Sequence, residues 1–205
     1  MTLSVFGKRG IFQRTLCPNT FSKRNIFCME VNKKEVIFIT GGARSGKSRH
    51  AQGLALKWSA NPIYVATARK WDGDFQDRIR RHQQERDDRW SSIEEEKHIS
   101  GLDLKGRVVV IDCVTLWITN FFIDLKNDID AVLEACKKEV DDLCRQEAVL
   151  IIISNEIGMG VHAETEIGRK FTDLQGWVNQ YIAAKADTVI LMVSGIPLTV
   201  KSPGS

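Results

Sequence analysis

Residues 41–48 read GGARSGKS, which fits the pattern G-x-x-x-x-G-K-[ST]. A short apolar run, residues 36–39, precedes this segment, and a stretch compatible with a helix follows it. Glycines let the backbone turn tightly and aim several N–H groups at one point, and the N-terminus of a helix attracts negative oxygen atoms. The order strand, glycine-rich loop, helix therefore predicts a cradle for phosphate groups, which we call the P-loop.

Every residue of the P-loop is expected to contact a bound nucleotide. Lys47 should reach the β- and γ-phosphates, and the Ser48 hydroxyl should ligate Mg²⁺. Lys47 is thus predicted to be catalytic as well as nucleotide-binding. The complete set of predicted phosphate contacts is Gly41, Gly42, Ala43, Arg44, Ser45, Gly46, Lys47 and Ser48.

A P-loop needs an acidic partner at the end of a neighbouring strand, which holds Mg²⁺ directly or through water. Asp112 follows the apolar run 108–111 and has the required position. The alternative role for Asp112 is to cap the N-terminus of a helix that includes Thr115. We expect the metal-binding role.

Continuous apolar runs rich in β-branched residues recur along the chain. Such runs are typical of strands that are buried on both faces of a parallel sheet. Between them, apolar residues at three- and four-residue spacing predict amphipathic helices over 129–144 and 167–182. This alternation predicts an α/β fold of the P-loop NTPase, RecA-like type, with a mostly parallel sheet and helices on both faces. The predicted strands are 36–39, 63–66, 108–111, 149–153 and 189–193.

The first 28 residues differ from the rest, because they contain Lys and Arg but neither Asp nor Glu. One interpretation is a transit peptide. The other is a segment upstream of a true start at Met29. In both cases we expect residues 1–28 to be poorly ordered and residues 29–205 to form one catalytic domain.

Composition excludes several classes of protein. The net charge of +3 is too small to indicate a nucleic-acid groove or a membrane-surface protein. No apolar run approaches the roughly 20 residues that span a bilayer. The five cysteines include no C-x-x-C pair, so we expect reduced thiols in a cytoplasmic protein rather than a zinc site.

His82 lies in a strongly charged stretch, and from spacing alone it would be a surface residue. A resemblance changes that interpretation. Several segments, in order and with comparable spacing over roughly residues 35–201, are similar to the bifunctional adenosylcobinamide kinase/adenosylcobinamide-phosphate guanylyltransferase family. The segments are GGARSGKSRHA, RIRRHQQER, IDCVTLWITN, SNEIGMGVHAETEIGRKFTDLQGWVNQ and VSGIPLTVK.

The resemblance implies two reactions on one chain. The first phosphorylates the aminopropanol hydroxyl of adenosylcobinamide, a corrinoid, with ATP or GTP. The second transfers GMP from GTP to that phosphate through a GMP–histidine intermediate, and the family's histidine matches His82. A neutral imidazole is a good nucleophile near pH 7. His50, His98 and His162 lack the matching context. The family also implies a homotrimer.

Further nucleotide contacts are carried over from the family by position. One group follows the second predicted strand, one follows the nucleophile, and one is an acidic residue whose register is uncertain because Glu95 and Glu96 adjoin it. These residues are Ala66, Thr67 and Ala68; Gln83, Gln84, Glu85 and Arg86; and Glu94. The Gly-rich stretch 155–160 is interpreted as a loop that faces the corrinoid or the phosphates, with an ordinary surface loop as the alternative.

Two departures from the family stand out. The first 28 residues are unmatched, and Arg81 stands where some relatives carry a second histidine. Two competing functions are a small-molecule kinase without nucleotidyl transfer and a RecA-like ATP-binding module. Trp117, Phe121 and Phe122 are either partly interfacial or part of a buried core helix.

A chain that begins at Met29 should fold and turn over like the full-length chain, because residues 1–28 offer no periodic apolar face that could dock on a core. The melting temperature and the steady-state rate of both chains provide the measurement. A drop of more than about 4 °C on truncation, which corresponds to roughly 1–2 kcal/mol for a domain of this size, would contradict the expectation.

Overall fold

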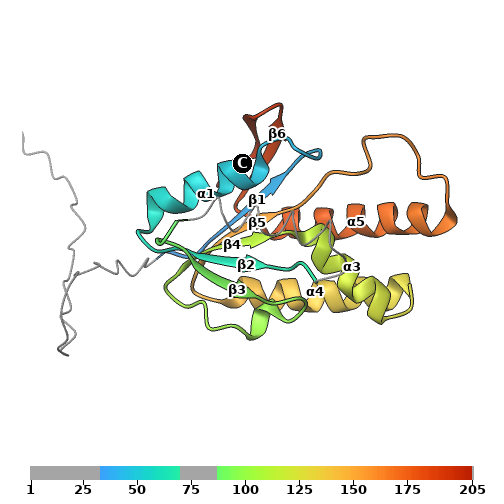
Figure 1. The fold of residues 1–205 in the computed structure, drawn as a ribbon, viewed down its shortest axis with the longest axis horizontal. Coiled ribbons are helices and arrows are strands. Elements are labelled where there is room, and N and C mark those ends of the chain that lie inside the picture. Colours follow the sequence, from blue (N-terminus) through green and yellow to red (C-terminus); the bar gives the residue numbers. More distant parts are fainter. Residues whose placement is uncertain (1–32, 70–86, 205) are drawn as a thin grey trace, which may run out of the picture.

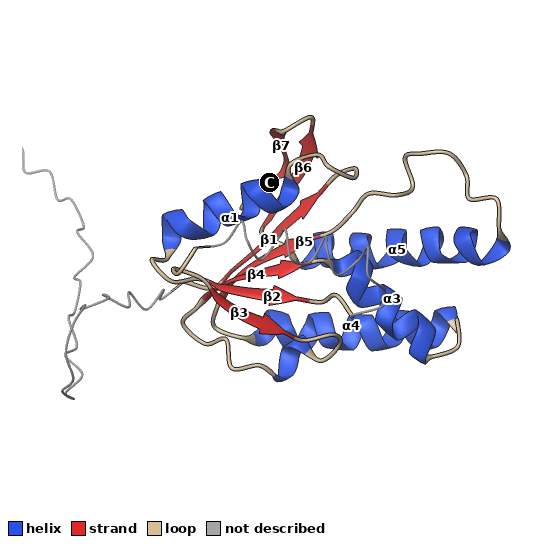
Figure 2. Ribbon diagram, in the orientation of Figure 1, coloured by secondary structure: helices blue, strands red, loops and turns tan. Residues whose placement is uncertain are grey.

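The computed structural model describes residues 33–69 and 87–204. Within these ranges a seven-stranded sheet has the order β3-β2-β4-β5-β1-β6-β7, and helices cover it on both sides (Figures 1 and 2). All neighbouring strands are parallel except β6 and β7, which are antiparallel. The predicted α/β fold with a mostly parallel sheet is confirmed.

The five strands predicted from apolar runs are all present, within one residue at each end. They are β1 (Glu35–Thr40), β2 (Ile63–Ala66), β4 (Val108–Asp112), β5 (Val149–Ile153) and β6 (Thr188–Val193). Strands β4 and β5 are almost completely buried, as expected for strands with helices on both faces.

Helix α1 (Lys47–Trp58) packs on one face of the sheet through Ala51 and Ala55. The other face carries α3 (Val114–Asp124), α4 (Ile129–Arg145) and α5 (Glu166–Lys185). A short 3-10 helix, η1 (Ile99–Gly101), joins this second layer against α4. Because Ala51 and Ala55 are small, α1 packs close to the sheet.

Helix ends follow from local side chains. The Asp128 carboxylate accepts a hydrogen bond from the N–H of Ala131 and caps α4, and the Thr165 hydroxyl accepts one from the N–H of Gly168 and caps α5. Helix α1 has no side-chain cap and no acidic residue in its first turn. Its N-terminal N–H groups are therefore available to an anion, as the P-loop motif predicts.

Two strands were not predicted, and both lie at edges of the sheet. Strand β3 (Ser91–Glu94) is polar and exposed, and β7 (Ile196–Lys201) is exposed along most of its length. A two-residue turn, Ser194-Gly195, connects β6 to β7 with both residues at positive φ, the geometry that suits a tight hairpin. Edge strands lack burial on both faces, so they lack the continuous apolar run that marks the others.

The aromatic residues of α3 belong to the core. Trp117, Phe121 and Phe122 are each at most 6% exposed, and Trp117 packs edge-on against Phe121 with ring centroids 5.5 Å apart. Of the two interpretations of these aromatics, the buried core helix is the one that the structure has. Burial raises the pKa of the Cys113 and Cys136 thiols to about 12, so both remain protonated at neutral pH.

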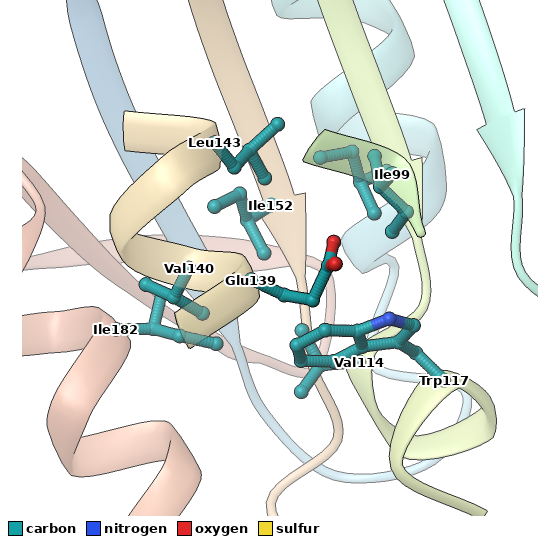
Figure 3. A pocket seen from close by; sticks show the side chains of 9 residues that line it. Ile99, Val114, Trp117, Glu139, Val140, Leu143, Ile152 and Ile182 are labelled. Atoms are coloured by element: carbon teal, nitrogen blue, oxygen red, sulfur yellow. The ribbon is translucent and has the colours of Figure 1, made fainter. Parts of the chain in front are cut away.

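A small cavity of about 20 Å³ lies between the sheet and α4. Figure 3 shows Ile99, Trp117 and Glu139 among the residues around it. The Glu139 carboxylate accepts a hydrogen bond from the N–H of Ser100 and lies 3.2 Å from the His98 ring. These contacts fasten η1 to α4. The cavity has room for about one water molecule, so it is a packing feature and not a ligand site.

The end of β7 caps the end of α5. The Lys201 ammonium donates hydrogen bonds to the carbonyl oxygens of Ala183, Ala184 and Ala186, the last at 2.6 Å. These are carbonyls at the C-terminus of a helix, where a cation is favoured. The last strand thus ties the edge of the sheet to the helical layer.

Lys201→Met should lower the free energy of unfolding by about 1.5 kcal/mol, because charge-assisted bonds to helix-end carbonyls disappear while the aliphatic stem remains. Urea denaturation monitored by circular dichroism measures the change. Lys170→Met is the matched control. Lys170 is exposed and pairs with Glu166 one turn away, so its removal should cost under about 0.5 kcal/mol. Equal effects of the two substitutions would contradict the capping role.

Candidate active site

The P-loop requires glycine at two positions. Gly41 has a φ of 143°, and a Cβ atom there would lie 2.5 Å from the carbonyl oxygen of Met192 in β6. Gly46, the N-cap of α1, has a φ of 92°. Side chains at these positions would meet both backbone strain and a neighbouring strand. The loop is therefore folded tightly at the carboxyl end of β1, against β6.

Lys47 turns back over the loop. Its ammonium donates hydrogen bonds to the carbonyl oxygens of Gly41 at 2.8 Å and Gly42 at 2.6 Å, and the residue is only 7% exposed. A buried positive charge held by loop carbonyls at a helix N-terminus is an arrangement that stabilises phosphate oxygens.

Asp112 faces the P-loop from the end of β4. Its Oδ2 atom accepts a hydrogen bond from the Ser48 hydroxyl at 2.7 Å and another from the Tyr64 hydroxyl at 2.8 Å. Helix α3 begins with Cys113 as its N-cap and has no side-chain cap bond, so the alternative role of Asp112 as a helix cap is not what the structure has.

The Ser48–Asp112 pair has the chemistry that Mg²⁺ prefers, since hydroxyl and carboxylate oxygens are hard ligands. Mg²⁺ usually keeps several waters and takes further oxygens from phosphate groups, so two protein side chains suffice. Among residues 33–69 and 87–204, no group of three or more His, Cys, Asp or Glu side chains forms a metal cage. The donor set fits a nucleotide-bound Mg²⁺ better than an ion held by protein alone.

The turn after β2 is fixed by its neighbours. The Thr67 hydroxyl donates to the carbonyl oxygen of Cys113 and accepts from the N–H of Cys113, both at 2.8 Å. The Asn120 side chain donates to the carbonyl oxygens of Thr67 and Glu96. The Thr67 hydroxyl is therefore committed to Cys113, the residue that follows β4, and this pair of bonds fixes the turn after β2 against the start of α3.

A cluster of charges secures the same region. The Arg69 guanidinium forms ion pairs with Glu96 at 2.6 Å and with Asp124 at 2.8 Å, and Lys97 also contacts Asp124. The Arg69 and Lys97 side chains hold the pKa of Asp124 well below its usual range. The turn after β2, the loop after β3 and the end of α3 are thus joined at the carboxyl edge of the sheet.

Glu94 ends β3 and is the register partner of Ala66 in β2. The Glu95 carboxylate accepts hydrogen bonds from the N–H groups of Lys97 and His98, and these bonds lower its pKa. Glu96 pairs with Arg69. The carboxylates of Glu95 and Glu96 thus have structural roles. Glu94 is exposed at the end of β3, and all three residues lie close to the turn after β2, because the Glu95 N–H also donates to the carbonyl oxygen of Ala66.

The loop that follows β5 lies against the P-loop. The N–H of Glu156 donates to the carbonyl oxygen of Gly41 at 3.0 Å, the same oxygen that Lys47 contacts. Asn155 donates to the Thr115 hydroxyl from both its backbone and its side chain. This loop is consequently part of the site's frame.

A buried polar network supports that loop from α5. The Asn179 side chain accepts from the Ser154 hydroxyl at 2.6 Å and donates to the carbonyl oxygen of Asn155, and Gln175 donates to both Ser154 and Asn179. Sequence reasoning missed these residues. Their signal is a pair of amides, four positions apart, within the apolar stripe of a helix, since a buried amide needs a partner.

The predicted residues divide into two groups. The structure brings together the P-loop, the turn at Ala66–Ala68, Glu94 and Asp112 along one edge of the sheet. The other group lies outside the described residues and comprises His82, Gln83, Gln84, Glu85 and Arg86. Along the described ranges, no helix is both long and apolar enough to cross a membrane.

A phosphate cradle at the carboxyl edge of a parallel sheet, with a paired Ser and Asp beside it, defines the class of P-loop nucleotide-binding proteins. The family model described as cobinamide kinase / cobinamide phosphate guanyltransferase matches residues 37–200. The chain belongs to this family.

Three relatives extend the match. The bifunctional adenosylcobalamin biosynthesis protein CobU of Escherichia coli (strain K12) is 38% identical, over 81% of this chain and 99% of that protein. CobP of Pseudomonas aeruginosa is 36% identical over 80% and 95%, and CobU of Salmonella typhimurium is 35% identical over 81% and 99%. A solved structure from Pyrococcus horikoshii OT3 has a TM-score of 0.49 at 11% identity over 86% of this chain and 89% of that one, too distant to add to the assignment.

Lys47→Ala should raise the dissociation constant for GTP by about tenfold or more and remove phosphoryl transfer, because charge-assisted contacts to the phosphates disappear. Titration with a fluorescent GTP analogue measures the affinity. Lys57→Ala, at the exposed end of the same helix, is the control and should bind GTP normally. Unaltered affinity and rate in a folded Lys47→Ala protein would remove the P-loop from the mechanism.

Proposed function

We propose that this chain phosphorylates adenosylcobinamide with ATP or GTP, and then transfers GMP from GTP to the product, giving adenosylcobinamide-GDP in cobalamin biosynthesis. The observation that carries the proposal is the family match over residues 37–200, which contains the assembled P-loop and its Ser48–Asp112 pair. Residues 29–205 are the catalytic domain in this proposal, supported by a single sheet whose strands run from Glu35 to Lys201.

In the kinase reaction, the corrinoid hydroxyl oxygen attacks the γ-phosphorus of the nucleotide and the bond to the β–γ bridging oxygen breaks. The hydroxyl proton is lost to solvent, and the nucleoside diphosphate leaves. Lys47 and the N–H groups of the P-loop stabilise the phosphate oxygens. Ser48 and Asp112 are the residues that would hold Mg²⁺, which neutralises charge on the phosphates when bound.

In the transferase reaction, a ring nitrogen of His82 attacks the α-phosphorus of GTP and pyrophosphate leaves. A phosphate oxygen of adenosylcobinamide phosphate then attacks the phosphorus of the GMP–histidine adduct, the P–N bond breaks, and His82 is regenerated. Gln83, Gln84, Glu85 and Arg86 hold the guanylyl group in this proposal. Two successive displacements avoid seating two bulky anions face to face.

The nucleoside is expected beside β2 and β3. Ala66, Thr67 and Ala68 provide backbone contacts, and Glu94 accepts hydrogen bonds from guanine N–H groups. The pairing of Ala66 with Glu94 in neighbouring strands supports this placement, because it puts the two predicted contacts next to each other at the carboxyl edge of the sheet.

The loop 155–160 is proposed to face the corrinoid or the phosphates. Its support is the bond from the Glu156 N–H to Gly41, which places the start of the loop against the P-loop. Further along, Met159 and Val161 are largely exposed. Exposed apolar side chains on a segment that starts at the P-loop suit a substrate that carries both an anionic group and a large ring.

A homotrimer in the cytoplasm completes the proposal. Strand β7 supports the oligomer, since Ile196, Leu198 and Val200 are 70%, 57% and 64% exposed on an edge strand. Exposed apolar edges favour association with another protein surface, because natural edges are otherwise covered or charged. A second copy of the chain would cover this edge.

His82→Ala should abolish the protein–GMP adduct and GMP transfer, while phosphorylation of adenosylcobinamide persists within about tenfold, because γ-phosphoryl transfer is a direct in-line displacement. Phosphorylated intermediate should therefore accumulate. Intact mass after incubation with GTP and Mg²⁺ detects the adduct, and the ratio of the two activities separates the roles.

Adduct formation by the unmodified chain should also fade as the pH falls below the pKa of the imidazole, about 6.5 for an unperturbed histidine, since protonated imidazole has no lone pair for attack. His98→Ala is the matched control and should keep both activities, because His98 contacts Glu139 of α4 on the outer layer. If the His82→Ala protein still makes adenosylcobinamide-GDP, His82 is not the nucleophile. If the unmodified chain phosphorylates adenosylcobinamide but forms no protein–GMP adduct, the result favours a kinase without nucleotidyl transfer.

A further inference from the structure

Tyr64 connects the middle of β2 to the P-loop acid. The residue is only 3% exposed, and its ring packs edge-on against Trp90 with centroids 6.0 Å apart, in the layer beneath α1. Its hydroxyl leaves this apolar layer and lies 2.8 Å from Oδ2 of Asp112. A phenol next to a carboxylate donates the hydrogen bond and the carboxylate accepts it, so Tyr64 is the donor.

Asp112 receives two donors on one oxygen. Oδ2 accepts from the Ser48 hydroxyl as well as from Tyr64, whereas within residues 33–69 and 87–204 no side chain donates a hydrogen bond to Oδ1. A carboxylate oxygen has about two lone-pair sites, so Oδ2 is saturated by these contacts. The carboxylate is thereby fixed in one orientation, and Oδ1 is the oxygen left for a metal ion or its waters.

We propose that Tyr64 is a positioning residue that orients Asp112 toward the nucleotide's Mg²⁺. The inference rests on the proposed use of a magnesium–nucleotide complex at this P-loop. The Ser48 hydroxyl alone cannot hold the Asp112 carboxylate in a fixed orientation, because the same hydroxyl is a proposed ligand of the metal ion. Tyr64 provides a second bond that does not involve the ligand, as outer contacts of metal-binding carboxylates do in general.

Packing does not explain the hydroxyl group of Tyr64. Phenylalanine would fill the same space against Trp90, and a buried hydroxyl carries a desolvation cost unless it is bonded. The chain contains one other tyrosine, Tyr181 of α5, whose hydroxyl also bonds a carboxylate, that of Asp141 at 2.9 Å. Asp141 pairs with Lys185 near the start of β1, away from the P-loop. Tyr181 is therefore a matched control.

The test compares Tyr64→Phe with Tyr181→Phe. The dissociation constant of a fluorescent, non-hydrolysable GTP analogue is measured in EDTA and then over a series of Mg²⁺ concentrations. Binding of Mn²⁺ to the protein–analogue complex is followed directly by electron paramagnetic resonance. For Tyr64→Phe, we expect nucleotide affinity in EDTA within about twofold of the unmodified chain, and a metal concentration for half-saturation about tenfold higher. Tyr181→Phe should match the unmodified chain in both.

A double-substitution cycle makes the role specific. In an Asp112→Asn background, Tyr64→Phe should cause no additional weakening of metal binding, because the group that it orients is already changed. Circular dichroism checks that each variant is folded. If Tyr64→Phe does not fold, Tyr64→Leu serves as a second variant, since it also removes the hydroxyl and adds neither volume nor a new donor.

Three results would overturn the inference. They are an unchanged metal midpoint in Tyr64→Phe, an equal loss of nucleotide affinity with and without metal, and a full additional loss in the Asp112→Asn background. Failure of the proposed function would look different. Metal-linked binding would be intact and Tyr64-dependent, while adenosylcobinamide was neither phosphorylated nor guanylylated.

Discussion

The structure depends on the burial of β1 in the middle of a parallel sheet. Residues 36–39 are buried on both faces, with β5 on one side and β6 on the other. Burying both faces requires a helical layer above and another below, and parallel neighbours require crossovers that return the chain to the same starting edge. The carboxyl ends of β1, β4 and β5 therefore meet, and so do Gly41, Asp112 and Asn155.

The sequence predicted the part of the fold whose signal is local or strongly periodic. Buried strands appear as unbroken apolar runs, and the P-loop appears as a motif whose residue types follow from tight backbone turns. Strand β3, with the sequence SSIE, carries no such signal, because its exposed edge position does not require apolar residues. Strand β7 contains apolar residues, but it also contains a proline, which is unusual in a central strand, and it is exposed, so its sequence does not resemble that of a buried strand.

The sequence predicted the phosphate-binding loop of the site better than it predicted the residues that hold the surrounding loops in place. The position of Asp112 beside Ser48 could be expected, because an acid at a strand end follows from the needs of a P-loop. Its role toward a metal ion stays a prediction. Gln175 and Asn179 were not found, because polar residues on a helix are normally solvent-facing and only the fold shows that these two meet Ser154. The contacts of Glu95 and Glu96 likewise needed coordinates, since the sequence does not show that Glu95 bonds the backbone of the following loop or that Glu96 pairs with Arg69.

The hairpin between β6 and β7 touches the P-loop. The N–H of Gly195 donates to the carbonyl oxygen of Ser45 at 3.0 Å, and a Cβ on Gly46 would lie 3.3 Å from the Cα of Gly195. The turn between β6 and β7 is therefore packed against the phosphate cradle, which lies some 150 residues earlier in the sequence. The conformation of this turn thus constrains the backbone of the P-loop through main-chain contacts, without any side chain of the hairpin having to meet a nucleotide.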